Sequence, residues 1–195
     1  MGVLADRECE PDRGANPVPH PINSYALVTY IPKPLGVFLD WIRRDLEPKS
    51  LAPRSHLTLL PPRPLTAGST VDKARSQLEH DLRFTRPLAV ELGKIAVFPK
   101  TNVVYVTVEA GFGSLHDIYR FLNRGVLDYK EQYPYHPHVT LAQGLTEGEA
   151  EVIARAATMR WKVFRGPNGI PVQSLIFVQN NSVNRWKDLA RYRLR

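Results

Sequence analysis

The sequence predicts an α+β fold made of two similar lobes, and three observations support this prediction. Stretches rich in β-branched and aromatic residues alternate with stretches whose apolar residues recur every three or four positions. The order strand, helix, short strand occurs twice, once between residues 25 and 59 and again between residues 103 and 141. A length of 195 residues with 43% hydrophobic content suits one globular domain and excludes a wholly disordered chain. We therefore expect each lobe to bury a sheet against helices.

The first lobe is predicted from its opening strand, helix and strand. Residues 24–31 are rich in β-branched and aromatic side chains, which is typical of a strand. Residues 34–46 carry apolar side chains at helical spacing, which predicts one buried helical face. Residues 54–60 predict a short strand. We expect Pro61 and Pro62 to end it, because proline cannot donate a hydrogen bond to a sheet.

Three further elements lead into the second lobe. Residues 70–83 have the spacing of apolar residues that a helix requires. Residues 88–98 and 102–110 predict two strands, since the proline and polar residues between them are typical of a turn.

The second lobe then repeats the order of the first. Residues 114–127 predict a helix, with Ser114 as its N-cap. Residues 138–141 predict a short strand. Residues 146–159 predict another helix, because Thr146 and the glutamate three residues later match a capping box.

The two ends of the chain differ in character. The final part predicts three strands, at residues 160–165, 172–179 and 186–194. Residues 1–23 contain four prolines and almost no large apolar side chain, which is typical of an extended tail. We therefore divide the chain into a flexible acidic tail, residues 1–23, and a single bilobal domain, residues 24–195.

The charge indicates an anionic partner. Lysine and arginine outnumber aspartate and glutamate by 26 to 19, which gives a net charge of +7. The tail carries −2, so the domain carries about +9. A nucleotide, RNA or phosphorylated metabolite would suit this balance, although the same charge could serve solubility alone.

Composition excludes several classes of protein. No apolar run is longer than four residues, whereas a transmembrane helix needs about 18. The N-terminus lacks the basic and apolar regions of a signal peptide. The single cysteine, Cys9, excludes an internal disulfide and a cysteine-based zinc site. We expect a monomeric, cytoplasmic protein without membrane contact.

Each lobe ends in the same tetrapeptide pattern, His-x-Thr-x. The first copy begins at His56 and the second at His138, and both have apolar residues at the x positions. Side chains alternate between the faces of a strand, so His56 and Thr58 share one face, as do His138 and Thr140. The histidine and threonine of one copy are then about 6.6 Å apart, from about 3.3 Å per residue, which lets both reach one small anion.

These residue types suit acid–base chemistry on a phosphate. Imidazole has an ordinary pKa near 6.5, so at neutral pH one histidine can remove a proton while the other donates one. Threonine hydroxyls can donate hydrogen bonds to the oxygens on which charge develops. The residues predicted to be catalytic are therefore His56, Thr58, His138 and Thr140.

A structural role or metal binding is the alternative to catalysis for these histidines. One His-x-Thr-x sequence often arises by chance, whereas two copies that each follow a strand and a helix favour a functional pair. His136 and His138 could be a metal pair, but catalytic zinc needs a third ligand and no carboxylate cluster lies nearby. We therefore expect neither a metal nor another cofactor.

The paired motifs resemble the signature of the two-histidine phosphoesterase superfamily, within it the bacterial 2'-5' RNA ligase / RNA 2',3'-cyclic phosphodiesterase branch. The resemblance covers residues 24–195 and includes the closing residues 175–178 and 192–194. It implies a bilobal α+β fold of two antiparallel sheets, flanked by helices, with one motif from each lobe in a central groove. It also implies metal-independent hydrolysis of a 2',3'-cyclic phosphate or a related 2'-5' or cyclic nucleotide phosphodiester. The resemblance favours His138 as the base and His56 as the acid, although the symmetry of the motifs leaves the assignment open.

Further residues are predicted to contact the substrate. Arg54 and His136 precede the motif histidines by two residues and could bind phosphate, as could Lys100, which lies in a predicted turn. For each of them a solvated rim position is the alternative. Aromatic side chains that could stack on a base, or else belong to the core, are Tyr25, Tyr30, Phe98, Tyr105, Tyr133 and Tyr135. Tyr135 is preferred because it is close to the second motif.

Two functions of different classes follow. The first is a phosphodiesterase acting on a nucleotide or RNA. The alternative is a non-catalytic module that binds nucleotide or RNA in the same groove. Binding alone does not require two titratable groups, so the paired histidines favour the enzyme. Turnover of a 2',3'-cyclic nucleotide distinguishes the two.

Overall fold

Two four-stranded antiparallel sheets form the centre of the molecule. The computed structural model describes residues 23–46, 53–182 and 185–195. The first sheet has the spatial order β2 (His56–Arg63), β1 (Ser24–Tyr30), β7 (Ser174–Ser182) and β8 (Arg185–Arg193). The second has the order β5 (His138–Ala142), β4 (Val104–Ala110), β3 (Leu88–Val97) and β6 (Gly169–Val172). The predicted α+β class with two antiparallel sheets is confirmed.

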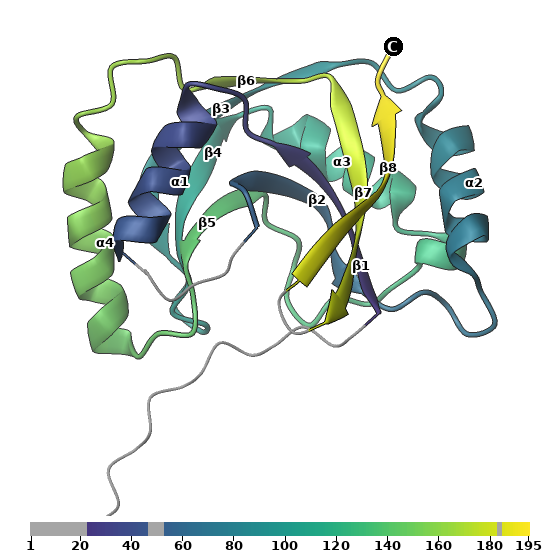
Figure 1. Ribbon diagram of the computed structural model, residues 1–195, viewed down its shortest axis with the longest axis horizontal. Helices are drawn as coiled ribbons and strands as arrows, with labels where there is room; N and C mark the ends of the chain where they lie inside the picture. The colour runs from purple at the N-terminus through teal and green to yellow at the C-terminus, as the bar shows by residue number, and fades with distance from the viewer. Residues whose placement is uncertain (1–22, 47–52, 183–184) are drawn as a thin grey trace, which may run out of the picture.

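Four helices surround the sheets (Figure 1). They are α1 (Leu35–Leu46), α2 (Val71–Leu82), α3 (Phe112–Leu122) and α4 (Glu147–Trp161), and a 3₁₀ turn, η1 (Gly125–Leu127), follows α3. Helices α1 and α4 pack together at one end of the molecule, and α2 lies at the opposite end against β8 and η1. None of the helices in the described ranges is long and apolar enough to cross a membrane.

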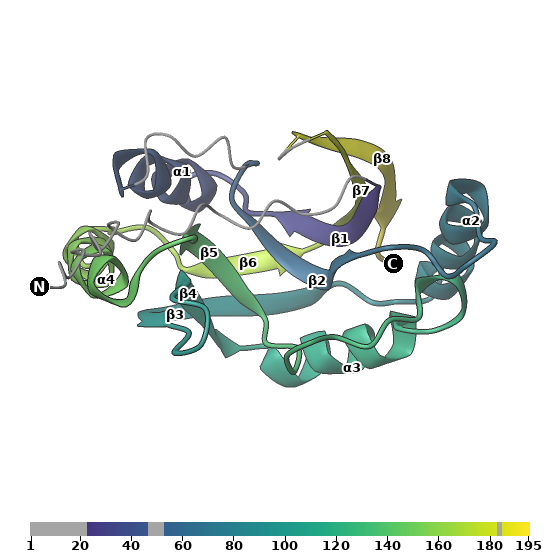
Figure 2. The same cartoon turned by 90° about the horizontal axis from the view of Figure 1, so that it is seen from below.

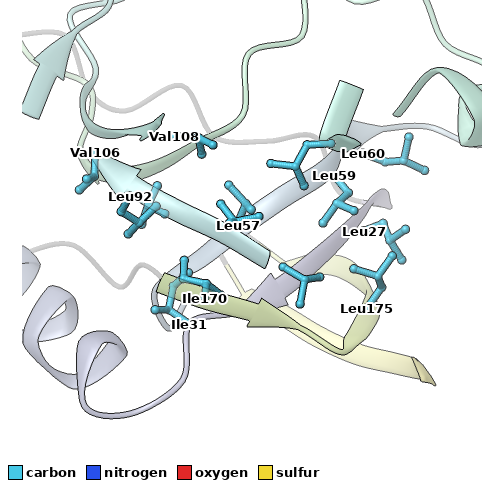
Figure 3. Close-up of a cluster of buried hydrophobic side chains, with 14 of the residues drawn as sticks. Leu27, Ile31, Leu57, Leu59, Leu60, Leu92, Val106, Val108, Ile170 and Leu175 are labelled. Carbon is cyan, nitrogen blue, oxygen red and sulfur yellow. The ribbon is translucent and has the colours of Figure 1, made fainter. Parts of the chain in front are cut away.

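One apolar core joins the two sheets. Leu27 and Leu57 of the first sheet belong to the same buried cluster as Leu92 and Val106 of the second (Figure 3). Burying a leucine side chain stabilises a fold by about 1.5–3 kcal/mol, so this shared cluster holds the sheets together. The two lobes predicted from the repeat therefore share a single interior.

The first sheet curls strongly, and Figure 2 shows its strands β7 and β8 bending round. The curl gives this sheet a second, smaller apolar cluster on its other face, formed by Ala26, Val28, Ile176 and Val178. Tyr30 and Trp186 pack at the margin of this smaller cluster.

The strands that carry the His-x-Thr-x motifs are edge strands. In the described part of each sheet, β2 pairs only with β1, and β5 pairs only with β4. The two edges contact each other, so the sheets meet along β2 and β5. Two motifs 82 positions apart in the sequence are thereby brought to one place.

Three predicted boundaries were wrong for physical reasons. Strand β2 continues through Pro61 and Pro62 to Arg63, because an edge strand tolerates residues without a backbone donor. Helix α3 begins before Ser114, since Gly111 adopts φ +86° and a Cβ there would lie 2.6 Å from a backbone oxygen. It also ends at Leu122 rather than at residue 127.

The predicted strand at residues 160–165 was also wrong. Helix α4 includes residues 160 and 161 and ends at Trp161. The indole nitrogen of Trp161 donates a 2.8 Å hydrogen bond to the Gly93 carbonyl. Strand β6 occupies residues that we did not assign to a strand of their own. The capping box of α4, formed by Thr146 and Glu149, is confirmed. The predicted tail lies outside the described residues except for Asn23.

Candidate active site

The two motifs present their polar side chains on the face opposite the core. The apolar residues of both motifs are buried, with exposed fractions of 2% or less. They are Leu57 and Leu59 of β2 and Val139 and Leu141 of β5. The intervening histidines and threonines are only partly buried. The alternation of each strand therefore turns His56 and Thr58, and likewise His138 and Thr140, toward the outside.

Each motif histidine is oriented by a backbone carbonyl two residues earlier. The distance from His56 Nδ1 to the Arg54 oxygen is 2.8 Å, and that from His138 Nδ1 to the His136 oxygen is 2.6 Å. A carbonyl can only accept a hydrogen bond, so Nδ1 must carry the proton in both rings. The neutral rings therefore keep an unprotonated Nε2, which is the nitrogen able to accept a proton.

Burial keeps both histidines in the neutral state. The pKa of His56 is lowered to about 4, mainly by burial and to a smaller extent by the nearby charges of Arg43 and His138. Burial also lowers the pKa of His138, with a smaller contribution from His136. An anion placed beside the two rings would favour their protonated forms and raise both pKa values.

The threonine hydroxyls are available to a ligand. Among the described residues, no protein group makes a hydrogen bond to the hydroxyl of Thr58 or Thr140. Each hydroxyl lies on the same face as the histidine of its own motif. Each motif thus presents one imidazole and one hydroxyl donor, and the two motifs are close enough for the charge of His138 to act on His56.

Helix α1 fixes the residue before His56. The Asp40 carboxylate accepts hydrogen bonds from the Ser55 backbone nitrogen, at 2.7 Å, and from the Ser55 hydroxyl, at 2.6 Å. Arg43 donates a 2.6 Å hydrogen bond to the Pro53 carbonyl. We did not predict these contacts. The signal in the sequence was two charged residues placed on or beside the apolar face of a helix.

Aromatic rings surround His138. Phe98 and Tyr105 stack with ring centres 4.0 Å apart, and the His138 ring meets Phe98 edge-on at 5.0 Å. His136 contacts the same two rings edge-on, at 5.4 and 5.8 Å. The structure thus brings Phe98 and His136 to the second motif. Lys100 is exposed in the turn that follows β3.

Three of the tyrosines predicted to stack on a base lie inside the protein. One is Tyr105, which is 7% exposed and stacks on Phe98. The other two are Tyr25 and Tyr135. Tyr25 stacks on Phe177 at 5.6 Å within the main core. Tyr135 is only 8% exposed, and its ring stacks on Tyr119 at 4.2 Å. Its hydroxyl donates a 2.9 Å hydrogen bond to the Thr58 carbonyl. All three rings are therefore covered by protein.

Arg54 lies at the exposed margin of the first motif. Its guanidinium carbon is 4.8 Å from the centre of the Tyr30 ring, a cation–π distance. Tyr30 is opposite His56 in the β1–β2 register. Burial, with the hydrogen bond to Asp188, raises the pKa of Tyr30, so its hydroxyl stays protonated.

A buried ion pair beyond the first motif was also missed. Arg63, at the end of β2, is 1% exposed and pairs with Glu131 in the segment that leads to β5. Arg63 also donates to the side chain of Asn123 and to the Leu127 carbonyl. The pair ties β2 to the segment that delivers the second motif.

Two open surface cavities lie away from the motif residues. A cavity of about 620 Å³ lies between α1 and the residues after α4, and a smaller one of about 250 Å³ lies between α2 and α3. Their linings contain none of the four motif residues. In the described ranges, no three histidine, cysteine, aspartate or glutamate side chains gather into a metal-binding group.

Comparisons with known proteins agree with this geometry. The sequence model of the 2'-5' RNA ligase superfamily matches residues 31–182, which include both motifs. A protein of Oceanobacillus iheyensis named as a phosphoesterase is 28% identical over 137 residues, 67% of this chain and 77% of that protein. The fold is similar to Escherichia coli LigT complexed with 3'-AMP, with a TM-score of 0.61, 16% identity, and coverage of 88% of this chain and 98% of that one. TT0787 of Thermus thermophilus also has a TM-score of 0.61, at 18% identity and coverage of 88% and 97%.

Proposed function

Because this chain belongs to the 2'-5' RNA ligase superfamily, we propose that it is a metal-independent phosphodiesterase that opens a 2',3'-cyclic phosphate, or a related 2'-5' or cyclic nucleotide linkage. The observation that carries the proposal is the shared orientation of the two motif histidines. Both donate Nδ1–H to a backbone carbonyl, and both therefore offer Nε2 to a ligand between the strands.

The chemistry divides between the two rings. His138 Nε2 takes a proton from a water molecule as the water oxygen bonds to phosphorus. The bond between phosphorus and one ribose oxygen breaks, and that oxygen takes a proton from Nε2 of protonated His56. The proton gained by His138 and the one lost by His56 are then exchanged with solvent. Thr58 and Thr140 donate hydrogen bonds to the non-bridging oxygens, where negative charge accumulates.

Binding of the phosphate should change the protonation of the motif histidines. In the free protein both rings are neutral because burial lowers the pKa of each. The phosphate charge raises the pKa of the ring that must act as the acid, so protonation of that ring accompanies binding. This favours activity at neutral to mildly acidic pH.

The substrate class rests on further observations. The domain carries a positive charge, and Arg54 is exposed next to the first motif. The partly exposed Phe98 lies beside the second motif and offers an aromatic ring, backed by the buried Tyr105, to a base. The complex of E. coli LigT with 3'-AMP supports a nucleotide as the ligand class. We propose that the enzyme acts as a monomer in the cytoplasm.

One panel of substrates tests this proposal. Purified protein is incubated in EDTA with 2',3'-cyclic mononucleotides, RNA with 2',3'-cyclic ends, 2'-5' oligonucleotides and cyclic dinucleotides, and each product is mapped to a 2'- or 3'-phosphate. We expect turnover of at least one class, lost in His56→Ala and His138→Ala. Binding without turnover of any class would overturn the proposal in favour of a nucleotide- or RNA-binding module.

A further inference from the structure

We propose that Tyr135 is a positioning residue that holds the two His-x-Thr-x strands at a fixed separation; this inference rests on the function proposed above. The side chain of Tyr135 comes from the segment just before β5 and reaches β2 of the other sheet. There its hydroxyl donates a 2.9 Å hydrogen bond to the backbone oxygen of Thr58, the threonine of the first motif.

The position of β2 explains why this oxygen needs a donor. An edge strand has backbone groups that its single neighbour cannot pair, and a buried carbonyl without a partner is destabilising. In the described part of the chain β2 forms ladder hydrogen bonds only with β1. Tyr135 supplies a donor at the motif threonine itself, so the bond acts on the backbone that aims the Thr58 hydroxyl.

The buried Tyr135 ring packs against two side chains of α3. It stacks on Tyr119 at 4.2 Å with only 11° between the planes, and it meets His116 edge-on at 5.0 Å. Both partners belong to α3. Tyr119 in turn lies 5.9 Å from the guanidinium carbon of Arg63, at the far end of β2. The hydroxyl is therefore a rigid link between α3 and β2 rather than a mobile surface group.

The same short segment also orients the second motif. The residue after Tyr135 is His136, whose backbone oxygen accepts the Nδ1–H bond of His138 at 2.6 Å. A displacement of this segment therefore changes two things at once, namely the backbone of Thr58 and the direction of the His138 ring. Misplacement of reacting groups by about 1 Å can lower a rate by about a hundredfold.

The first test uses a variant that removes only the hydroxyl. Tyr135→Phe keeps the stacked ring and should fold. With the substrate identified by the panel above, we expect kcat to fall by about tenfold to a hundredfold with little change in KM. Tyr192→Phe is the matched control, because the Tyr192 hydroxyl also donates to a backbone carbonyl, that of Arg75, at 3.3 Å, but far from the motifs. An unchanged kcat in Tyr135→Phe would overturn the proposal.

A second test separates positioning from a general structural effect. In the Thr58→Val background, the direction of the Thr58 hydroxyl no longer matters, so Tyr135→Phe should lower kcat by a smaller factor than it does in the wild-type protein. An equal loss in both backgrounds would contradict a positioning role.

The third test requires no substrate and therefore stands apart from the proposed function. Histidine Cε1–H resonances are followed by NMR as a function of pH. Loosening the strands lets solvent reach His56, so its pKa should rise toward 6.5 in Tyr135→Phe and stay low in Tyr192→Phe. Should Tyr135→Phe fold poorly, Tyr119→Leu is the alternative variant. It removes the ring that stacks on Tyr135 but keeps the Tyr135 hydroxyl, and it should also raise the pKa of His56. If a folded variant leaves this pKa unchanged, the link is refuted. An inactive wild-type protein would refute the proposed function alone.

Discussion

Tyr30 on β1 donates a 2.6 Å hydrogen bond to Asp188 on β8, although β7 lies between these two strands in the sheet. In a flat sheet, strands separated by one neighbour are about 10 Å apart. The contact is made on the inner side of the curl, next to the small apolar cluster that includes Val28 and Ile176. Tyr30 also lies opposite His56 in the β1–β2 register, so the contact that closes the curl is made next to the first motif.

Removing this contact should loosen the curled sheet. Tyr30→Phe keeps the ring beside Arg54 but loses the hydrogen bond, which contributes about 1 kcal/mol in proteins. We expect the free energy of unfolding in urea to fall by about that amount. The free energy of unfolding should fall less in Asp188→Asn, because asparagine retains an acceptor for the Tyr30 hydroxyl. A larger loss in Asp188→Asn than in Tyr30→Phe would show that the charge, not the bond, stabilises the curl.

The motif histidines should be the most sensitive positions for activity. Replacing either His56 or His138 by alanine removes one partner of the acid–base pair, and we expect kcat to fall by about 10²- to 10⁴-fold. The double variant should lose little more than the worse single variant, since the two act as a unit. The pH–rate profile of the wild-type protein should be bell-shaped. Full activity in both single variants would exclude the assignment.

The motif threonines should act through their hydroxyls rather than their volume. Thr58→Val and Thr140→Val keep the shape of the side chain but remove the donor. Losing a hydrogen bond to a charged group costs about 1.5–3 kcal/mol, which corresponds to a loss in kcat of about tenfold to a hundredfold. Thr58→Ser and Thr140→Ser retain the donor, so steady-state kinetics should show them closer to the wild-type protein. Equal losses for valine and serine would assign the threonines to packing.

Stability should fall in mild acid because of His56. Its pKa is lowered from 6.5 to about 4 in the folded state, so the unfolded chain binds the proton first as pH falls. The contribution to stability is therefore complete above pH 6.5 and is lost as pH falls from about 6.5 to about 4, by up to about 3 kcal/mol. Urea unfolding at pH 7, 5.5 and 4.5 should show a shallower decline in His56→Gln than in the wild-type protein. Parallel declines would mean that His56 is not buried in its neutral form.

The ion pair between Arg63 and Glu131 should be far more important than a surface pair. Arg63→Met leaves a mostly buried carboxylate without its partner, and breaking such a pair costs about 3–5 kcal/mol. The control is Arg120→Met, which removes an exposed pair with Asp117 on α3 and should cost about 0.5 kcal/mol or less. Urea unfolding compares the two. The double variant Arg63→Met/Glu131→Met should recover part of the loss.

Local patterns in the sequence predicted most of the fold. The helices at α1, α2 and α4 follow from apolar spacing and, at Thr146, from a capping box that the structure contains. Errors arose where a distant contact decides a boundary. The Trp161 side chain reaches Gly93, which favours a longer α4 over the strand that Val163 and Phe164 predict. Such a contact joins residues 68 apart and leaves no local pattern.

In the candidate site, too, local patterns were predictable from the sequence and contacts between distant residues were not. The repeat of His-x-Thr-x, with leucine or valine between the polar residues, was sufficient to place the four motif side chains on one face of each strand. The covered position of Tyr135 was not predictable, because it depends on β2 meeting β5 edge to edge. The partners of Arg63 come from a segment about 60 residues later, so the sequence shows only an arginine after two prolines.

The strand order decides how much of the chain each sheet must bring together. All four strands of the second sheet lie between residues 88 and 172, whereas the first sheet combines strands from residues 24–63 with strands from residues 174–193. The pairing of β1 with β7 joins distant parts of the chain. The hydrogen bond between the side chains of Tyr25 and Gln179, for example, joins residues 154 apart. Pairings over such distances form slowly. Both motif strands pair with neighbours close in the sequence, with Tyr30 opposite His56 and Thr107 opposite His138. We therefore expect the closure of β1 on β7, rather than the pairing of either motif strand, to be the slow step of folding.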